Sequence, residues 1–150
     1  MKDIRSIVCR KPGDGFTLVE LIMVVAVLSI VVTLALPGLA TAKRRANETS
    51  AITALRMISS AQSQHRVRNG TFTDVTTLES IGFLDQNFSD NEKSGYMFEN
   101  AQDPSSSAWA LQANPVNVGV TGDRYYYVDT SGVIRYNDSA QAGPADPAIQ

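Results

Sequence analysis

The sequence predicts an α+β protein in which a long N-terminal helix carries a small C-terminal antiparallel β-sheet. Three observations lead to this prediction. A run without charged residues extends from Leu21 to Ala42. An amphipathic helical pattern continues from there to about Arg68, and short strand-like segments separated by turn residues fill most of the remaining chain. With 150 residues, one domain is expected.

The uncharged run is long enough to cross a membrane. As a helix it would extend about 33 Å, against about 30 Å for the hydrocarbon core of a bilayer. A single acid, Glu20, directly precedes it. Since an acid at the edge of an apolar span needs a partner or a headgroup-level position, Glu20 is a functional candidate. Cleavage between Gly15 and Phe16 would supply a partner, because the new α-amino group of Phe16 would lie about one helical turn from Glu20.

Three interpretations of this run compete. As an ordinary signal peptide it would be cut after Ala40-Thr41-Ala42, which would release the chain from Lys43 onward, but the run exceeds the usual apolar length of such signals. As a permanent anchor it would leave a tethered domain and give Glu20 no role. As an assembly helix it would first lie in a membrane and later pack against copies of itself. Glu20 favours this third interpretation.

The segment Gly15-Phe16-Thr17-Leu18-Val19-Glu20, followed by the long apolar run, resembles the class III signal of type IV pilins and the related pseudopilins. In that family a prepilin peptidase cleaves after the glycine and methylates the new N-terminal residue. The resemblance therefore implies that residues 1–15 are a leader removed on maturation, that Phe16 is the methylated N-terminus, and that Glu20 is an assembly acid. It also implies the pilin fold.

The resemblance further implies a structural filament subunit that serves adhesion, motility or DNA uptake. Its partners would be copies of itself in a helical filament, the prepilin peptidase, an inner-membrane assembly platform, and membrane lipid before assembly. The precursor would lie in the inner membrane, and the mature protein in a cell-surface filament or a periplasmic pseudopilus. Two alternatives stay open, namely a pseudopilin of a type II secretion system and a membrane-tethered β-domain that acts as a binding module.

The long helix is expected in two parts, a transmembrane and assembly part over residues 16–42 and an amphipathic part over residues 43–69. Pro37 and Gly38 predict a helix break within the first part, because proline removes a backbone donor and crowds the preceding turn. In the second part, small and aliphatic residues recur at helical spacing on one face, and they are Ala51, Ala54, Leu55, Ile58 and Ala61.

A globular β head is expected over residues 70–137, with about three or four strands laid on the amphipathic helix. The strand candidates are residues 95–100, 108–113, 124–129 and 133–136. Gly132 is available for a hairpin loop that needs positive φ. Residues 138–150, rich in Ala, Pro, Asp and Gln, are predicted to be a flexible tail.

The residues of the head predict packing rather than chemistry. No Ser-His-Asp set, phosphate loop or Cys/His cluster is present, so we expect no enzyme activity, no cofactor and no metal site. The only cysteine, Cys9, lies in the expected leader, which excludes a disulfide in the mature chain. A solitary His65 is expected at a surface or interface, and the run Tyr125–Tyr127 is expected to pack on alternate faces of a strand. Other candidate sites are weak, namely a calcium site at Asp123 and Asp129 and a nucleic-acid contact at Arg66 and Arg68.

Charge is distributed unevenly between stem and head. Residues 43–68 contain six basic residues and one acid, whereas residues 69–150 contain three basic residues and eleven acids. A basic stem beneath an acidic head would help to position neighbouring subunits in a filament.

Overall fold

The computed structural model describes residues 15–84, 88 and 91–149, and for residues 34–37 it describes the backbone alone. The chain divides into two compact units, Met1–Pro37 and Gly38–Gln150. The predicted leader, including Cys9, lies outside the described residues except for Gly15. One helix, α1 (Leu18–Asn69), contributes residues to both units.

The start of α1 is fixed by a side-chain cap. Thr17 precedes the helix, and its Oγ1 accepts a hydrogen bond from the backbone N–H of Glu20 at 3.2 Å. The carbonyl of Thr17 accepts the N–H of Leu21 at 3.1 Å, which is the first bond of the helical ladder. The sequence Thr17-Leu18-Val19-Glu20 thus has the threonine and the acid of a capping box, a local signal that adds to the family resemblance.

The end of α1 is fixed by a glycine. Gly70 has φ of 76°, a left-handed conformation that a side chain disfavours. Its N–H donates to the carbonyl of Arg66 at 2.8 Å and closes the last turn. Helix α2 (Val75–Ser80) follows after a short loop and is capped at its start by Asp74.

The head contains a five-stranded antiparallel sheet in which neighbours along the chain are neighbours in space, in the order β1-β2-β3-β4-β5. The strands are β1 (Glu92–Lys93), β2 (Tyr96–Gln102), β3 (Ala110–Pro115), β4 (Tyr125–Asp129) and β5 (Ile134–Asn137). Such a meander needs only short connections, and Gly132 adopts the predicted positive φ in the β4–β5 loop. The α+β class predicted from the sequence is confirmed, with the two-residue β1 added at one edge.

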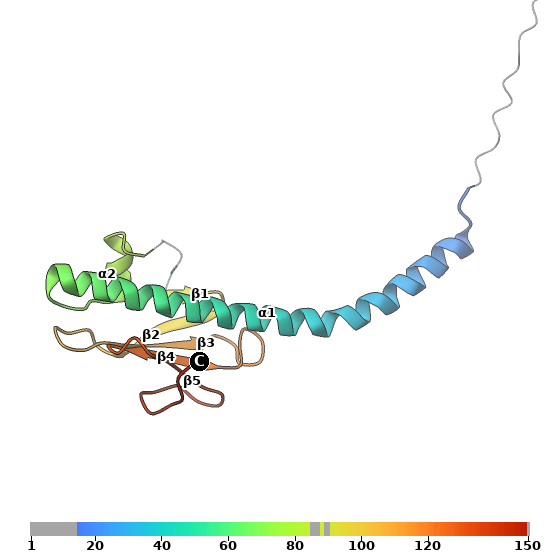
Figure 1. Ribbon diagram of the computed structural model, residues 1–150. Coiled ribbons are helices and arrows are strands. Elements are labelled where there is room, and N and C mark those ends of the chain that lie inside the picture. Colours follow the sequence, from blue (N-terminus) through green and yellow to red (C-terminus); the bar gives the residue numbers. More distant parts are fainter. Residues whose placement is uncertain (1–14, 85–87, 89–90, 150) are drawn as a thin grey trace, which may run out of the picture. The chain divides into compact units, whose positions relative to one another are not determined.

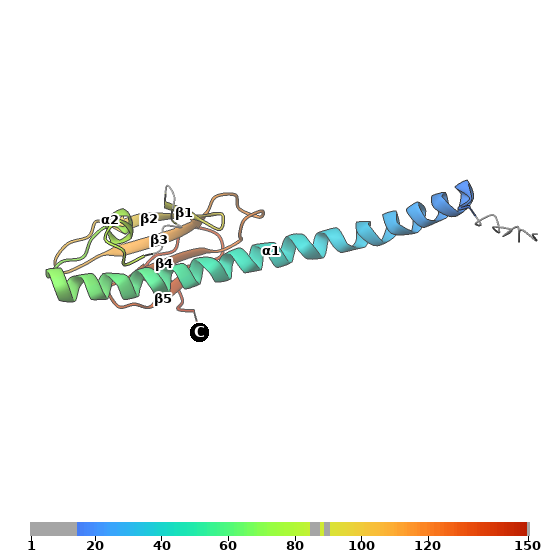
Figure 2. The ribbon, with the colours of Figure 1, turned by 90° about the horizontal axis from the view of Figure 1, so that it is seen from above.

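One face of the sheet packs on the helical residues 38–69, as Figures 1 and 2 both show. Ala51, Leu55 and Ile58 are buried there together with Ala54 and Ala61, so the predicted amphipathic face is confirmed. From the sheet, Phe98, Leu111 and Val128 complete the same core. Alternation along each strand places these residues on the helix side and their neighbours on the other.

Residues 138–149, for which the composition predicts a flexible tail, make backbone hydrogen bonds to β5. Ile149 N–H donates to the Ile134 carbonyl at 2.9 Å, and Tyr136 N–H donates to the Pro147 carbonyl at 3.0 Å. Ala142 is fully buried in a small cluster with Ala110 and Tyr127, on the sheet face opposite α1. The segment thus pairs with the outer edge of β5 and packs against the Tyr127 ring. This segment has few apolar side chains, and its backbone hydrogen bonds to β5 hold it against the sheet instead.

Candidate functional site

The Gly15–Phe16 peptide bond lies directly before the capped end of α1. Gly15 and Phe16 are outside any helix or strand, and the Phe16 side chain is 79% exposed. A bond in this position could enter the active site of a peptidase without unwinding the helix. Glu20 is also exposed and lies in the first turn of α1.

Helix α1 exposes a continuous apolar surface within Met1–Pro37. Large hydrophobic side chains are exposed on every side of the helix between Leu18 and Val32. The same stretch gives the helix a segment that is long and apolar enough to cross a membrane, by length and composition. A surface of this kind is unstable in water, so it must be covered by lipid or by other protein chains.

The hydroxyl groups in this segment are satisfied inside their own helix. Ser29 Oγ donates to the carbonyl of Val25 at 2.7 Å, and Thr33 Oγ1 donates to the carbonyl of Ser29 at 2.8 Å. Since a polar group without a partner is costly in hydrocarbon, these bonds suit a helix surrounded by apolar groups.

The predicted break at Pro37 and Gly38 stays a prediction. The helical assignment of α1 continues through both residues, while the side chain of Pro37 lies outside the described part of the structure. The division of the chain into two units falls between these two residues.

In the head, two polar side chains of α1 hold the loop that leaves the helix. Gln62 is buried and binds both backbone groups of Thr73, whose N–H donates to Gln62 Oε1 at 3.1 Å and whose carbonyl accepts from Nε2. His65 is buried as well, and its Nδ1 lies 2.8 Å from the Thr71 carbonyl. His65 is therefore a core residue with a structural partner, and the surface or interface position expected from the sequence is corrected.

The arginines near the end of α1 lie over aromatic rings. The guanidinium carbon of Arg66 is 4.8 Å from the centre of the Phe72 ring, and that of Arg68 is 5.1 Å from the Phe83 ring. Both interactions are of the cation–π type and help to cover the top of the core. A packing role explains the two arginines without nucleic acid.

The tyrosine run alternates as predicted. Tyr126 points into the helix-side core with Tyr96, while Tyr125 and Tyr127 contribute to the cluster on the opposite face. Tyr96 donates its hydroxyl hydrogen to the Arg124 carbonyl at 2.9 Å. Burial raises the pKa of Tyr96 and of Tyr126 well above the ordinary value, so both rings stay neutral. They are structural residues.

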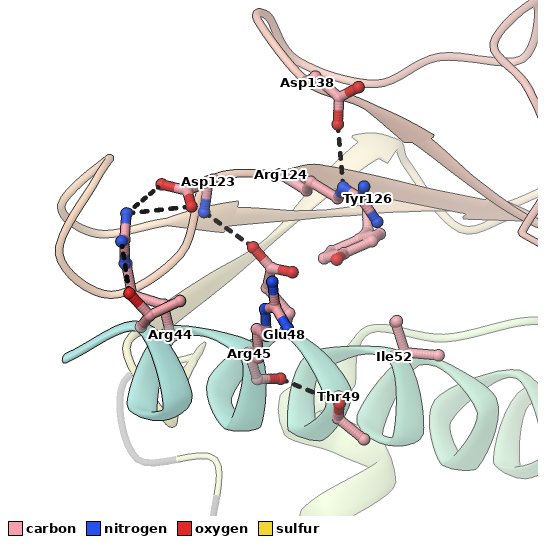
Figure 3. Close-up of a pocket in the computed structure, with 10 residues that line it drawn as sticks. Arg44, Arg45, Glu48, Thr49, Ile52, Asp123, Arg124, Tyr126 and Asp138 are labelled. Carbon is pink, nitrogen blue, oxygen red and sulfur yellow. Dashed lines mark hydrogen bonds and ion pairs between the residues drawn. The ribbon is translucent and has the colours of Figure 1, made fainter. Parts of the chain in front are cut away.

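A polar cleft of about 720 Å³ lies between α1 and the β3–β4 connection of the head. Figure 3 shows its charged walls, in which Arg44 forms an ion pair with Asp123 at 3.0 Å and Arg124 one with Asp138 at 2.9 Å. The N–H of Asp123 also donates to Glu48 Oε1 at 3.0 Å. Because both ion pairs are partly exposed, each contributes little to stability. The contacts of Asp123 with Arg44 and Glu48 fix the position of the head along helix α1.

Among residues 15–84, 88 and 91–149, no set of three or more His, Cys, Asp or Glu side chains is placed to hold a metal ion. Asp123, one of the two acids considered for calcium, is paired with Arg44, and Asp129 instead binds the N–H and hydroxyl of Ser131 in the β4–β5 loop.

Comparison with known proteins identifies the N-terminal segment. Residues 11–36 match the model of the prokaryotic N-terminal methylation motif. Over 71 residues the chain is 34% identical to the type IV wide pilus major component PilA4 of Thermus thermophilus, a match that covers 47% of this chain and 54% of the relative. The match thus spans about half the length of that curated protein.

The matched motif overlaps the capped start of α1 and most of its apolar run, and the β head packs on the later part of the same helix. The chain is therefore similar to a type IV pilus component over about half its length and carries the methylation motif at its N-terminal end.

Proposed function

We propose that this protein is the structural subunit of a type IV pilus-like filament, polymerised through its N-terminal helix. The observation that carries the proposal is the apolar surface of α1, exposed on every side directly after a methylation motif. Such a surface needs lipid before assembly and neighbouring helices after it. The similarity to a major pilus component supports a pilus rather than a secretion pseudopilus.

In this proposal a prepilin peptidase cuts between Gly15 and Phe16 and Phe16 is then N-methylated. The cut leaves the cap intact, because Thr17 and Glu20 both stay in the mature chain. The new amine of Phe16 lies about one turn from Glu20 of the same chain. In a bundle of copies it can pair equally with Glu20 of a neighbour, which would fix the axial register of the subunits.

The precursor would reside in the inner membrane, and the mature subunit would end in a surface filament. Transfer of the helix from lipid to a filament core exchanges one apolar environment for another, so little hydrophobic free energy is released. An inner-membrane assembly platform would therefore have to supply work.

The decisive experiment is the intact mass and N-terminal residue of the protein from membranes and from sheared filaments. A methylated Phe16 in both fractions is the expected result. A start at Lys43 would mean a secreted domain, and an uncut Met1 would mean a tethered binding module; either result would remove the filament function. Correct processing without sheared filaments, with the protein retained in the periplasm, would indicate a pseudopilin of a secretion system.

A further inference from the structure

The loop between β3 and β4 exposes three valines in close succession. Val116, Val118 and Val120 are 43%, 60% and 69% exposed, respectively. They alternate with Asn117 and Gly119, and we call these three exposed side chains the patch. The patch is absent from the core clusters of the head.

This loop is held in one conformation by its own hydrogen bonds. The Asn117 carbonyl accepts from the backbone N–H groups of Val120 and Thr121, at 3.1 and 2.9 Å. Gly119 N–H donates to the Gly122 carbonyl at 3.0 Å, and Thr121 Oγ1 accepts the Asn117 N–H at 3.1 Å. The valines are therefore presented by a closed turn rather than by a loose segment.

The loop is fastened to α1 just beyond the apolar run. Thr121 accepts a bond from Asn47 Nδ2 at 2.8 Å, and Asp123 binds Arg44 and Glu48. These helix residues follow Ala42 by two to six positions, which is about 3–9 Å along the helix axis. In Figures 1 and 2 the loop forms the end of the sheet nearest the start of the 38–69 helix segment.

If residues 21–42 span a bilayer, the membrane–water boundary must lie close to Ala42. The helix residues that hold the loop follow Ala42 by only two to six positions, so the attachment points of the loop would then lie near headgroup level. Leu39, 69% exposed, precedes Ala42 by three positions on the same helix.

The charges at this end of the head suit a lipid surface. Four basic residues gather here, and two of them, Arg44 and Arg124, are paired with Asp123 and Asp138. Within the described chain, no ion pair involves the other two, Lys43 and Arg45. Long basic side chains next to an apolar span extend naturally towards phosphate groups. Lys43 and Arg45, both within three residues of the end of the span, are thus left for an external partner.

We propose that the loop of residues 116–122 is a membrane-contact element, which inserts its three valines into the interfacial region of the bilayer that holds the precursor. Lys43 and Arg45 bind lipid phosphates beside it. The contact fixes the orientation of the head against the membrane before assembly. It rests on the proposed function only in requiring that the apolar run is inserted in lipid.

The test uses the full chain with Cys9→Ser, reconstituted in vesicles of phosphatidylcholine and phosphatidylglycerol. A nitroxide is attached at Val118→Cys, and collision with oxygen, which concentrates in lipid, is compared with collision with a water-soluble nickel chelate. The matched control is Ser131→Cys in the exposed β4–β5 loop, where Gly132 faces Ser59. That loop lies about 22 Å farther along the helix than Arg44.

The expected result is an oxygen-to-nickel collision ratio several-fold higher at residue 118 than at residue 131. A third label at Ile30→Cys reports on the span itself. If residue 30 is in lipid while residue 118 is as water-accessible as residue 131, the loop proposal alone is overturned. If residue 30 is water-accessible, insertion of the span fails and the loop proposal fails with it.

A second copy of the chain is the competing occupant of the patch. It would reveal itself by dipolar broadening between labels at residue 118 that disappears, together with the shielding from nickel, when the vesicles are diluted with lipid. That outcome would overturn the membrane contact. Shielding that persists at one chain per vesicle supports it.

Discussion

The side chain of Gln62 pairs with the backbone of Thr73 as a neighbouring strand would, by bonding both its N–H and its carbonyl. Its side-chain amide donates to the Thr73 carbonyl and accepts the Thr73 N–H at 3.1 Å, so that one buried side chain satisfies both polar groups of one peptide residue. This pairing anchors the first loop of the head to α1. His65 adds a second contact to the same loop, through the carbonyl of Thr71 alone.

Substitution Gln62→Leu should destabilise the head, because it leaves both backbone groups of Thr73 without a partner in a buried setting. We expect a loss of about 1–3 kcal/mol or more in the free energy of unfolding, measured by denaturant titration of the full chain in detergent. Gln64→Leu is the control, since Gln64 is exposed and bonds only Ser60 on its own helix. Equal losses in the two variants would contradict the assigned role of Gln62.

Gly122 is required by the close approach of Tyr96. A Cβ at residue 122 would lie 2.0 Å from the Tyr96 hydroxyl oxygen, whereas one at Gly143 would meet nothing within 4 Å. Gly122→Ala should therefore displace the buried tyrosine and cost about 1–3 kcal/mol or more, as overpacking does. Gly143→Ala should leave the unfolding midpoint nearly unchanged. A Gly122→Ala protein with wild-type stability and an unchanged Tyr96 environment would refute the contact.

The cap of α2 predicts a pH dependence. The Thr76 hydroxyl and the Thr77 N–H, both at 2.6 Å, lower the pKa of the Asp74 carboxyl below its usual range, against the smaller opposing effect of desolvation. A lowered folded-state pKa adds stability above the unfolded value of about 4, and this stability is lost as the pH falls through the folded value.

Asp74→Asn tests this dependence, because asparagine also caps helices but carries no charge. The variant should be less stable than wild type at pH 7, and the difference should shrink as the pH falls through the lowered folded-state pKa of Asp74. The measurement is the thermal midpoint of both proteins across the pH range. A difference that does not change with pH would argue against the charge as its source.

Glu20 has two separable roles in our proposals, as part of the capped helix start and as the assembly acid. Glu20→Gln keeps a residue suited to the capping box but removes the charge. We expect normal helix content and processing with loss of filaments. Thr17→Val should instead remove the bond to the Glu20 N–H and cost about 1 kcal/mol of helix-start stability, with the charge retained. Filament yield and far-UV circular dichroism distinguish the two effects.

The C-terminal segment should be protected from solvent. The N–H groups of Tyr136 and Ile149 are both in the ladder that joins β5 to residues 147–149. We expect hydrogen exchange at these amides to be slowed well beyond that of the exposed β4–β5 loop, whose opening costs little free energy. If these amides exchange as fast as those of the β4–β5 loop, the segment is the flexible tail that its composition predicts.

The sequence by itself determined the stem and its N-terminal signal. The uncharged run after Glu20 and the helical repeat of small and aliphatic residues are local patterns, which the order and spacing of neighbouring residues show directly. The alternating strands of the head followed from the same kind of local signal, and Tyr126 lies on the face opposite to Tyr125 and Tyr127, as predicted.

Tertiary structure decided what depends on residues far apart in the chain. Burial of Gln62 and His65 requires the loop at residues 71–73, the order of residues 138–149 requires the edge of β5, and the position of the exposed valines requires the bonds from Arg44 and Asn47 to the β3–β4 loop. The sequence predicted a flexible tail over residues 138–150 and a surface position for His65, because local composition does not show which distant groups a residue will bond. Hydrogen bonds to distant backbone groups leave no periodic trace in a sequence, and only the folded chain shows where they form.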